Sequence, residues 1–189
     1  NKNVGSKVIM AMTLITTNSP SGAASSSFTS SIDSTYKLFI FKWFDVNPVT
    51  DQAFFTFNGS VDGGSNYTVT KTTTYFEARA DEGTTTSFEY KTDNDVAQGT
   101  GYQNLCRSVG NDNDQSTAGT LWLFNPSNTT YVKHFYAQTS TYASSSPYDY
   151  AIHGFIGGYF NTTDNIDAID FKFDSGNIDV GTIKMYGVG

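Results

Sequence analysis

The sequence is short of cysteine, proline, glutamate and basic residues. Its single cysteine, Cys106, cannot form a disulfide within the chain, and only His134 and His153 could act as a base for a catalytic thiol. We therefore expect Cys106 to be a small buried side chain. Eleven Lys and Arg against eighteen Asp and Glu give a net charge of −7. Without a basic cluster, this balance excludes nucleic-acid binding by phosphate neutralisation.

Long apolar runs are also absent. The longest, residues 8–12, is far shorter than a membrane-spanning segment, so we expect no membrane insertion. Leucine occurs five times, whereas Thr, Ser, Gly and Asn occur 26, 20, 17 and 15 times, and Phe and Tyr together 27 times. Threonine and aromatic residues favour strands, and Asn, Gly and Ser favour turns. This composition predicts an all-β protein.

Runs of strand-forming residues alternate with turn sequences along the whole chain. At 189 residues, the length favours one domain spanning 1–189, with residues 1–27 as an N-terminal strand and a flexible Ser-rich segment. The spacing favours an antiparallel β-sandwich or a barrel. We expect strands at residues 7–16, 28–30, 36–46, 53–57, 67–70, 74–80, 87–90, 101–107, 120–125, 130–138, 151–161, 168–174 and 181–187.

Three features of this pattern predict particular arrangements. The turn 175–177 between the last two runs predicts a C-terminal β-hairpin. The segment 93–119 is long, acidic and rich in glycine, which predicts a surface loop or an excursion over one end of the fold. His134 lies between aromatic residues, which predicts a packed imidazole rather than a ligand.

The run YKLFIFKWF is apolar on both faces. Alternation places Phe39, Phe41 and Trp43 on one side, which we assign to the core. The apolar residues on the other side indicate either a subunit contact or further burial within the chain. The residues on that second side are Tyr36, Leu38, Ile40 and Phe44.

Catalytic and metal-binding patterns are weak. Glycoside hydrolysis needs two carboxylates on facing positions. The only dense acidic group is Glu77, Asp81 and Glu82. Asp81 and Glu82 are expected in a solvated turn rather than on the strand, so the group does not form a catalytic pair and we expect no enzymatic activity. Residues 93–95 and 111–114 offer oxygen ligands for calcium but lack the glycine and distal glutamate of an EF-hand. We expect no cofactor, with calcium as the alternative.

A tyrosine-rich segment offers a binding surface. Tyr142, Tyr148 and Tyr150 lie among small residues beside Asp149. A tyrosine presents a flat apolar face and a polar tip, which suits a sugar ring or a protein partner. The other interpretation is tyrosine packing at the edge of a sheet.

Long blocks of the chain resemble a known group of proteins. The blocks YKLFIFKWFDVNPVTDQAFF, GNDNDQSTAGTLWLFNPSNTTYVKHF and GYFNTTDNIDAIDFKFDSGNIDVGTIKMYGVG resemble structural proteins of bacteriophages that infect marine bacteria and cyanobacteria. The resemblance extends over residues 13–189. It implies a β-sandwich of the jelly-roll, concanavalin-like lectin type, without a catalytic motif.

The same resemblance implies a function and a location. The chain would be a capsid-decorating or tail-fibre module on the virion surface, extracellular when mature. Its partners would be other virion proteins, further copies of itself in a trimer or symmetric array, and a glycan on the host. The alternative function is a carbohydrate-binding module of a secreted bacterial protein.

Overall fold

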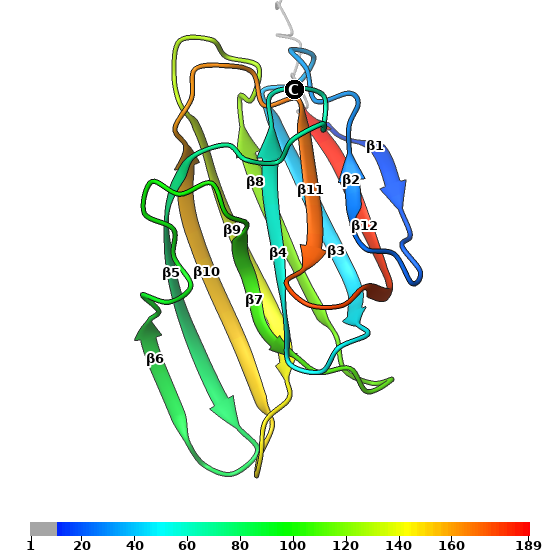
Figure 1. The fold of residues 1–189 in the computed structure, drawn as a ribbon, viewed down its shortest axis with the longest axis vertical. Coiled ribbons are helices and arrows are strands. Elements are labelled where there is room, and N and C mark those ends of the chain that lie inside the picture. The colour runs from blue at the N-terminus through cyan, green and yellow to red at the C-terminus, as the bar shows by residue number, and fades with distance from the viewer. Residues whose placement is uncertain (1–10) are drawn as a thin grey trace, which may run out of the picture.

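A computed structural model describes residues 11–189, which form twelve strands and no helix. All strand pairs are antiparallel (Figure 1). The prediction of an all-β, antiparallel protein is therefore confirmed. The strands are β1 (Met12–Asn18), β2 (Ser26–Phe28), β3 (Leu38–Pro48), β4 (Ala53–Ser60), β5 (Lys71–Asp81), β6 (Thr86–Tyr90), β7 (Gln103–Val109), β8 (Thr117–Phe124), β9 (Lys133–Ala143), β10 (Tyr150–Phe160), β11 (Ala168–Phe173) and β12 (Ile178–Val188).

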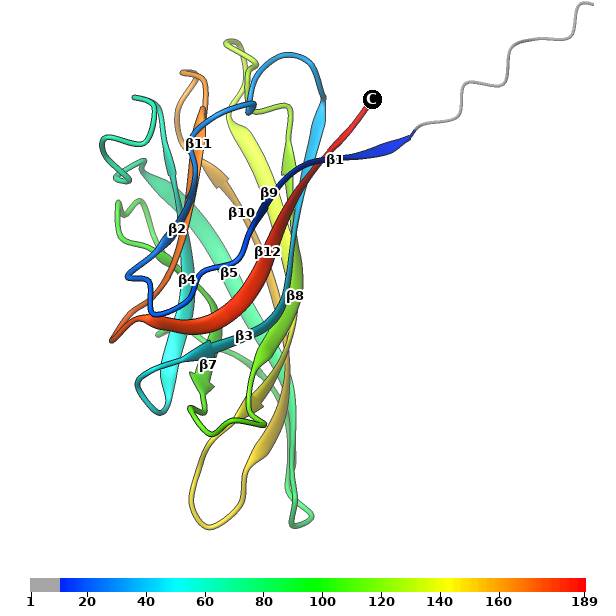
Figure 2. The same cartoon turned by 90° about the vertical axis from the view of Figure 1, so that its right-hand side faces the viewer.

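The strands are arranged in two layers of one continuous sheet. Eight strands form the larger layer, in the order β1-β12-β3-β8-β9-β10-β5-β6, and four form the smaller layer, in the order β7-β4-β11-β2. The layers are joined through one pair of residues, Val109 of β7 and Ala143 of β9. Figure 2 shows the smaller layer facing the larger one across the interior.

The core between the layers is largely aromatic. Phe39, Phe41 and Trp43 of β3 are all wholly buried. The ring of Trp43 lies 5.7 Å from that of Phe55 on β4. The ring of Phe41 lies 5.3 Å from that of Phe28 on β2. Because each of these contacts joins one layer to the other, burial of aromatic area holds the layers together.

Alternation along each strand explains why these residues face inward. In β9, Phe135 and Ala137 are buried, whereas His134 and Tyr136 between them are exposed. Successive side chains of a strand point to opposite faces, so one face packs on the core and the other faces solvent. We call the side of the larger layer that faces the smaller layer its inner face, and the opposite side its outer face.

The sheet nearly closes on itself. Its two end strands, β1 and β2, follow one another in the chain. The amide of Asn18 donates hydrogen bonds to the Ser26 hydroxyl and to the Ser27 carbonyl, at 3.2 and 3.0 Å. Ala23 between the two strands forms a β-bridge with Ile178 of β12. These contacts tie the end of β1 to the start of β2, so the two edge strands are joined there.

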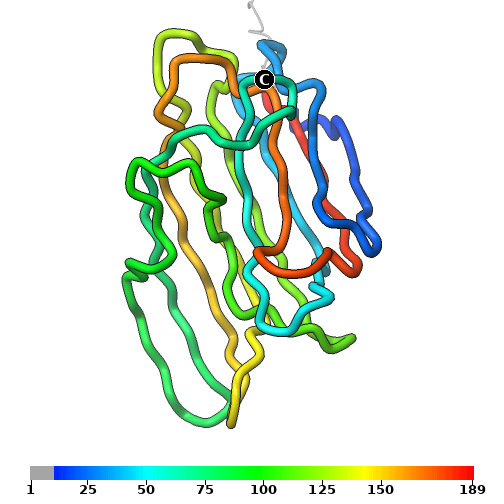
Figure 3. Tube along the Cα trace, viewed as in Figure 1, coloured from blue at the N-terminus to red at the C-terminus, as the bar shows by residue number. Residues whose placement is uncertain are grey.

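The expectation of a C-terminal hairpin is wrong, because the last two strands do not pair with each other. β11 pairs with β4 and β2 in the smaller layer, whereas β12 pairs with β1 and β3 in the larger layer. The turn 175–177 contains Gly176 at a φ of 69° and carries the chain from one layer to the other (Figure 3). The alternation predicted both strands and the turn, but the backbone groups of the two strands bond to other partners.

Two further expectations need correction. The segment 93–119 is not one surface loop, because it contains all of β7 and the start of β8. No strand forms at residues 67–70, and the expected strand at 7–16 lies partly outside the described residues.

Candidate functional site

Two strand connections meet at the end of the molecule opposite the C-terminus (Figures 1 and 2). One is the β5–β6 turn, and the other joins β9 to β10. The amide of Glu82 in the first turn donates a hydrogen bond of 3.1 Å to the carbonyl of Asp149 in the second. A Cβ atom at Gly83 would lie 3.2 Å from the ring of Tyr148, so that ring packs against a glycine. The two connections therefore form one surface.

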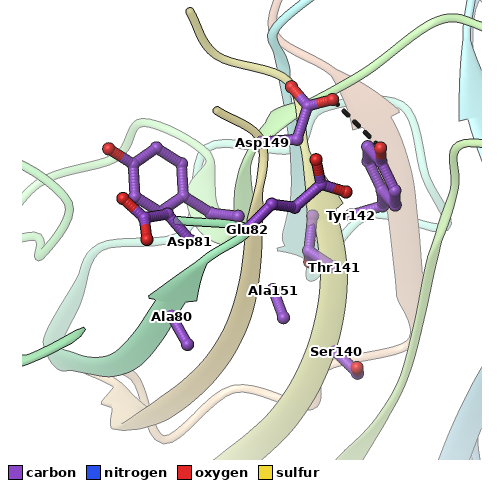
Figure 4. A pocket seen from close by; sticks show the side chains of 9 residues that line it. Ala80, Asp81, Glu82, Ser140, Thr141, Tyr142, Asp149 and Ala151 are labelled. Atoms are coloured by element: carbon purple, nitrogen blue, oxygen red, sulfur yellow. Dashed lines mark hydrogen bonds between the residues drawn. The ribbon is translucent and has the colours of Figure 1, made fainter. Parts of the chain in front are cut away.

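A pocket of about 460 Å³, the tyrosine pocket, lies between these connections (Figure 4). Ala80 on β5 and Ala151 on β10 are register partners on the outer face. Tyr142 on β9 pairs with Ala151 from the other side. Small side chains therefore leave space beside the aromatic ring. The residues that line the pocket are Ala80, Asp81, Glu82, Ser140, Thr141, Tyr142, Asp149, Tyr150 and Ala151.

Hydrogen bonds fix the position of one acidic side chain in the pocket. The Tyr142 hydroxyl donates to Oδ2 of Asp149 at 3.0 Å, and the Ser145 amide donates to Oδ1 at 2.8 Å. The hydrogen bond to Asp149 is also the main reason that the pKa of Tyr142 is raised above its usual value. A carboxylate held in this way has lone pairs left to accept hydrogen bonds from a ligand.

Three of the four residues predicted from the tyrosine-rich segment line the pocket: Tyr142, Asp149 and Tyr150. Tyr148 stands outside the lining, half exposed against Gly83. Asp81 and Glu82 complete the lining from a different hairpin, so no pattern in the tyrosine-rich segment points to them. The pocket thus combines tyrosine rings, carboxylates and hydroxyls, which are groups suited to binding a polyhydroxylated ligand.

Glu77 lies in a strand, as the expected strand 74–80 implies, but it is not solvated, and the expected turn position of Asp81 is wrong. Glu77 is wholly buried on the inner face of β5, where Arg107 of β7 donates to both of its carboxylate oxygens at 2.8–3.0 Å. Asp81 is the last residue of β5 and accepts a hydrogen bond of 2.7 Å from the Thr85 amide. Only Glu82 is an exposed turn residue.

The two Asx-rich segments considered for calcium are bound into local hydrogen bonds or exposed. Asn94 is buried, and its side-chain oxygen accepts a hydrogen bond of 2.9 Å from Asn104. Asp95 accepts one of 2.6 Å from the Tyr90 hydroxyl. Residues 111–114 are exposed. Within residues 11–189, no group of three or more His, Cys, Asp or Glu side chains is arranged to hold a metal ion.

The outer face of the larger layer carries an apolar row across five strands, which we call the aromatic row. The strand register places its members side by side. Trp122 and Tyr136 stack with ring centres 4.4 Å apart. Tyr136 is 41% exposed and Leu14 is 50% exposed. The row consists of Tyr136, Trp122, Ile40, Tyr186 and Leu14.

The residues predicted as a subunit contact divide between two faces. Ile40 belongs to the aromatic row, Leu38 is half-buried on the same face of β3, and Phe44 is exposed further along that strand. Tyr36 precedes β3 and packs edge-on against the buried Phe39, with ring centres 5.9 Å apart. The structure therefore separates Tyr36 from the other three residues.

Cys106 and the two histidines lie on opposite sides of the larger layer. The thiol is buried in the core, 2.8 Å from the Thr117 hydroxyl, and burial raises its pKa. His134 and His153 are exposed on the outer face, where His134 lies edge-on to Tyr159. A cysteine–histidine pair is therefore not formed.

Comparison with known proteins adds no further assignment. No protein-family model, curated protein or solved structure matches the chain. No helix capable of crossing a membrane occurs in the part of the chain that the structure describes.

Proposed function

We propose that this chain is a non-enzymatic module on the surface of a bacteriophage particle, with its tyrosine pocket directed toward a host glycan. The two layers would then be those of a β-sandwich of the jelly-roll, lectin-like type. The module would decorate the capsid or form part of a tail fibre, and many copies would act together. Weak single contacts gain strength from such multivalent display.

One observation supports display most directly: the positions of the chain ends and of the pocket. The start of β1 and the C-terminal residue Gly189 lie at one end of the molecule, and the tyrosine pocket lies at the other (Figures 1 and 2). A connection to a particle made near the first end would leave the pocket directed outward. The net charge of −7 is consistent with a soluble surface that does not bind the packaged genome.

The chemistry of the pocket supports a glycan as the ligand. The face of a tyrosine ring can pack against the C–H face of a sugar. Asp149, Glu82 and the hydroxyl of Ser140 can accept hydrogen bonds from sugar hydroxyls. A volume of about 460 Å³ lies within the range of small-ligand sites.

The second candidate function is a carbohydrate-binding module of a secreted bacterial protein. The same pocket favours it, because recognition of a sugar requires the same groups in either setting. The two functions differ in location: the first places the chain in purified phage particles, and the second places it beside a secreted enzyme.

A glycan array probed with the purified chain tests the recognition step. We expect binding to a restricted set of host-surface glycans, and the Tyr142→Ala variant should bind them at least about tenfold more weakly, since a packed aromatic contact and the orientation of Asp149 are both lost. The matched control is Tyr131→Ala, because Tyr131 is 70% exposed and lies outside this pocket. Equal binding by both variants, or no glycan bound, would contradict recognition through this pocket.

A further inference from the structure

The only two arginines of the sequence line one small cavity. Arg79 of β5 and Arg107 of β7 both border a space of about 130 Å³. Tyr150 lines this cavity as well as the tyrosine pocket. The cavity therefore lies next to the tyrosine pocket but has a different lining. Its remaining residues are Gln52, Ser108, Ala143, Ser144, Ser145 and Ile152.

A β-bulge in β7 brings two neighbouring polar residues to this cavity. Ala53 of β4 pairs with Val109, and Phe55 pairs with Cys106, so Arg107 and Ser108 together oppose the single residue Phe54. Ser108 has a φ of 54°, in the left-handed region. In a regular strand these two side chains would point to opposite faces, whereas a bulge redirects one of them. Both consequently line the same cavity.

Both arginines at the cavity already face carboxylates of the protein. Arg107 binds both oxygens of the buried Glu77. Arg79 lies 3.5 Å from Glu89, which also binds Lys91. The charge of Asp93 also raises the pKa of Arg107, so three cations face three carboxylates, and a ligand would bind through donors that remain free rather than through an excess of positive charge.

Each guanidinium also keeps hydrogen-bond donors for a further acceptor. Arg107 uses Nε and Nη2 on Glu77, and Arg79 uses Nε on the Ser87 hydroxyl and Nη2 toward Glu89. Within residues 11–189, neither Nη1 group has a hydrogen-bond partner in the protein. The hydroxyls of Ser108, Ser144 and Ser145 add further donors to the lining.

The size of the cavity limits what it can hold. A volume of about 130 Å³ corresponds to roughly four water molecules, at about 30 Å³ each. It accommodates one small charged group but not a sugar ring. Guanidinium groups bind carboxylates and sulfates strongly, because their planar donors match the spacing of two oxygens.

We propose that this cavity, the oxyanion cavity, binds one singly charged oxyanion group, a carboxylate or a sulfate ester, carried on a larger molecule that stays outside. An acidic saccharide is the chemical class that carries such groups. The proposal does not depend on the location of the protein or on ligand binding in the tyrosine pocket.

The two arginines provide a direct readout by nuclear magnetic resonance. With two arginines in the chain, a ¹⁵N-labelled sample gives two Nε–H signals, which the Arg79→Gln variant assigns. The probes are sodium glucuronate, methyl sulfate, inorganic sulfate and glucose, each titrated against sodium chloride at equal ionic strength. We expect glucuronate or methyl sulfate to shift both signals in a saturable way, and glucose to shift neither.

Variants then test the site. Arg79→Gln should weaken binding at least about tenfold, and its fold is checked by thermal unfolding. The matched control, Lys184→Gln, removes a cation from the outer face and should leave the affinity unchanged. No saturable shift with any oxyanion would overturn the proposal, as would equal affinity in Arg79→Gln. A response to inorganic sulfate alone would overturn the assignment to a group carried on a larger molecule.

Discussion

Replacement of Glu77 by glutamine should destabilise the fold strongly. The side chain is wholly buried, and Arg107 donates three hydrogen-bond contacts to its two oxygens. Lys91 lies 3.9 Å away from the same carboxylate. Glutamine has nearly the same volume but no charge, and its amide nitrogen would face the guanidinium donors. The change therefore leaves a partly buried cation without its counter-charge.

The magnitude follows from how deeply the pair is buried. Removal of one member of a buried ion pair costs roughly 3–5 kcal/mol. The Arg107 side chain is 20% exposed, so water can partly solvate the orphaned guanidinium, and we expect the lower end of the range, about 3 kcal/mol. For a chain of this length, that loss lowers the melting temperature by roughly 6–12 °C.

Urea unfolding followed by tryptophan fluorescence measures this loss, because Trp43 lies in the core. The control is Glu82→Gln, which removes the same charge from an exposed turn and should change the free energy of unfolding by less than about 0.5 kcal/mol. The double variant with Arg107→Gln should recover part of the loss, since it removes the orphaned charge. A loss below about 1 kcal/mol in the single variant would refute the buried-pair reasoning.

Three further predictions concern packing, pH and assembly. Gly119→Ala should lower the free energy of unfolding by about 3 kcal/mol, measured with a denaturant. The added Cβ would lie 2.6 Å from the Gln138 carbonyl oxygen and closer still to the buried Trp43 ring. A change near zero would contradict this packing. Burial lowers the pKa of Lys71 to about 8, so the unfolded chain holds a proton that the folded chain releases, and stability should rise by about 2 kcal/mol between pH 7.5 and 9.5. The Lys71→Met variant should show no such rise in the free energy of unfolding. If its stability rises with pH as in the unchanged protein, Lys71 is not the cause. Sedimentation at micromolar concentration should show a trimer or larger symmetric array that Tyr136→Asp weakens, whereas a 20.6 kDa species at all concentrations would exclude association through the aromatic row.

Periodicity in the sequence predicted which side chains face inward. Phe39, Phe41 and Trp43 were assigned to the core because they alternate with other residues, and all three are wholly buried. It could not predict which strands pair, because backbone hydrogen bonds are the same whichever strand supplies them. This is why β11 and β12, expected as a hairpin, lie in different layers.

The candidate site could likewise be predicted only in part from the sequence. The segment around Tyr142 and Asp149 could be chosen from its composition. Glu82 and the burial of Glu77 could not, because each depends on a residue distant in the chain: Glu82 bonds to Asp149, and Glu77 to Arg107. No local pattern around Glu77 distinguishes a buried carboxylate from a solvated one.

The location of the chain in a phage particle tests the central proposal most directly. Particles of a phage whose genome encodes this chain are purified and imaged by cryo-electron microscopy, and the structure of residues 11–189 is fitted into the map. The proposal predicts density for repeated copies on the capsid or tail surface, with the end that carries Tyr142 and Asp149 facing outward. Absence of the chain from the particle, together with its recovery as part of a secreted bacterial protein, would contradict the proposal and favour the carbohydrate-binding module.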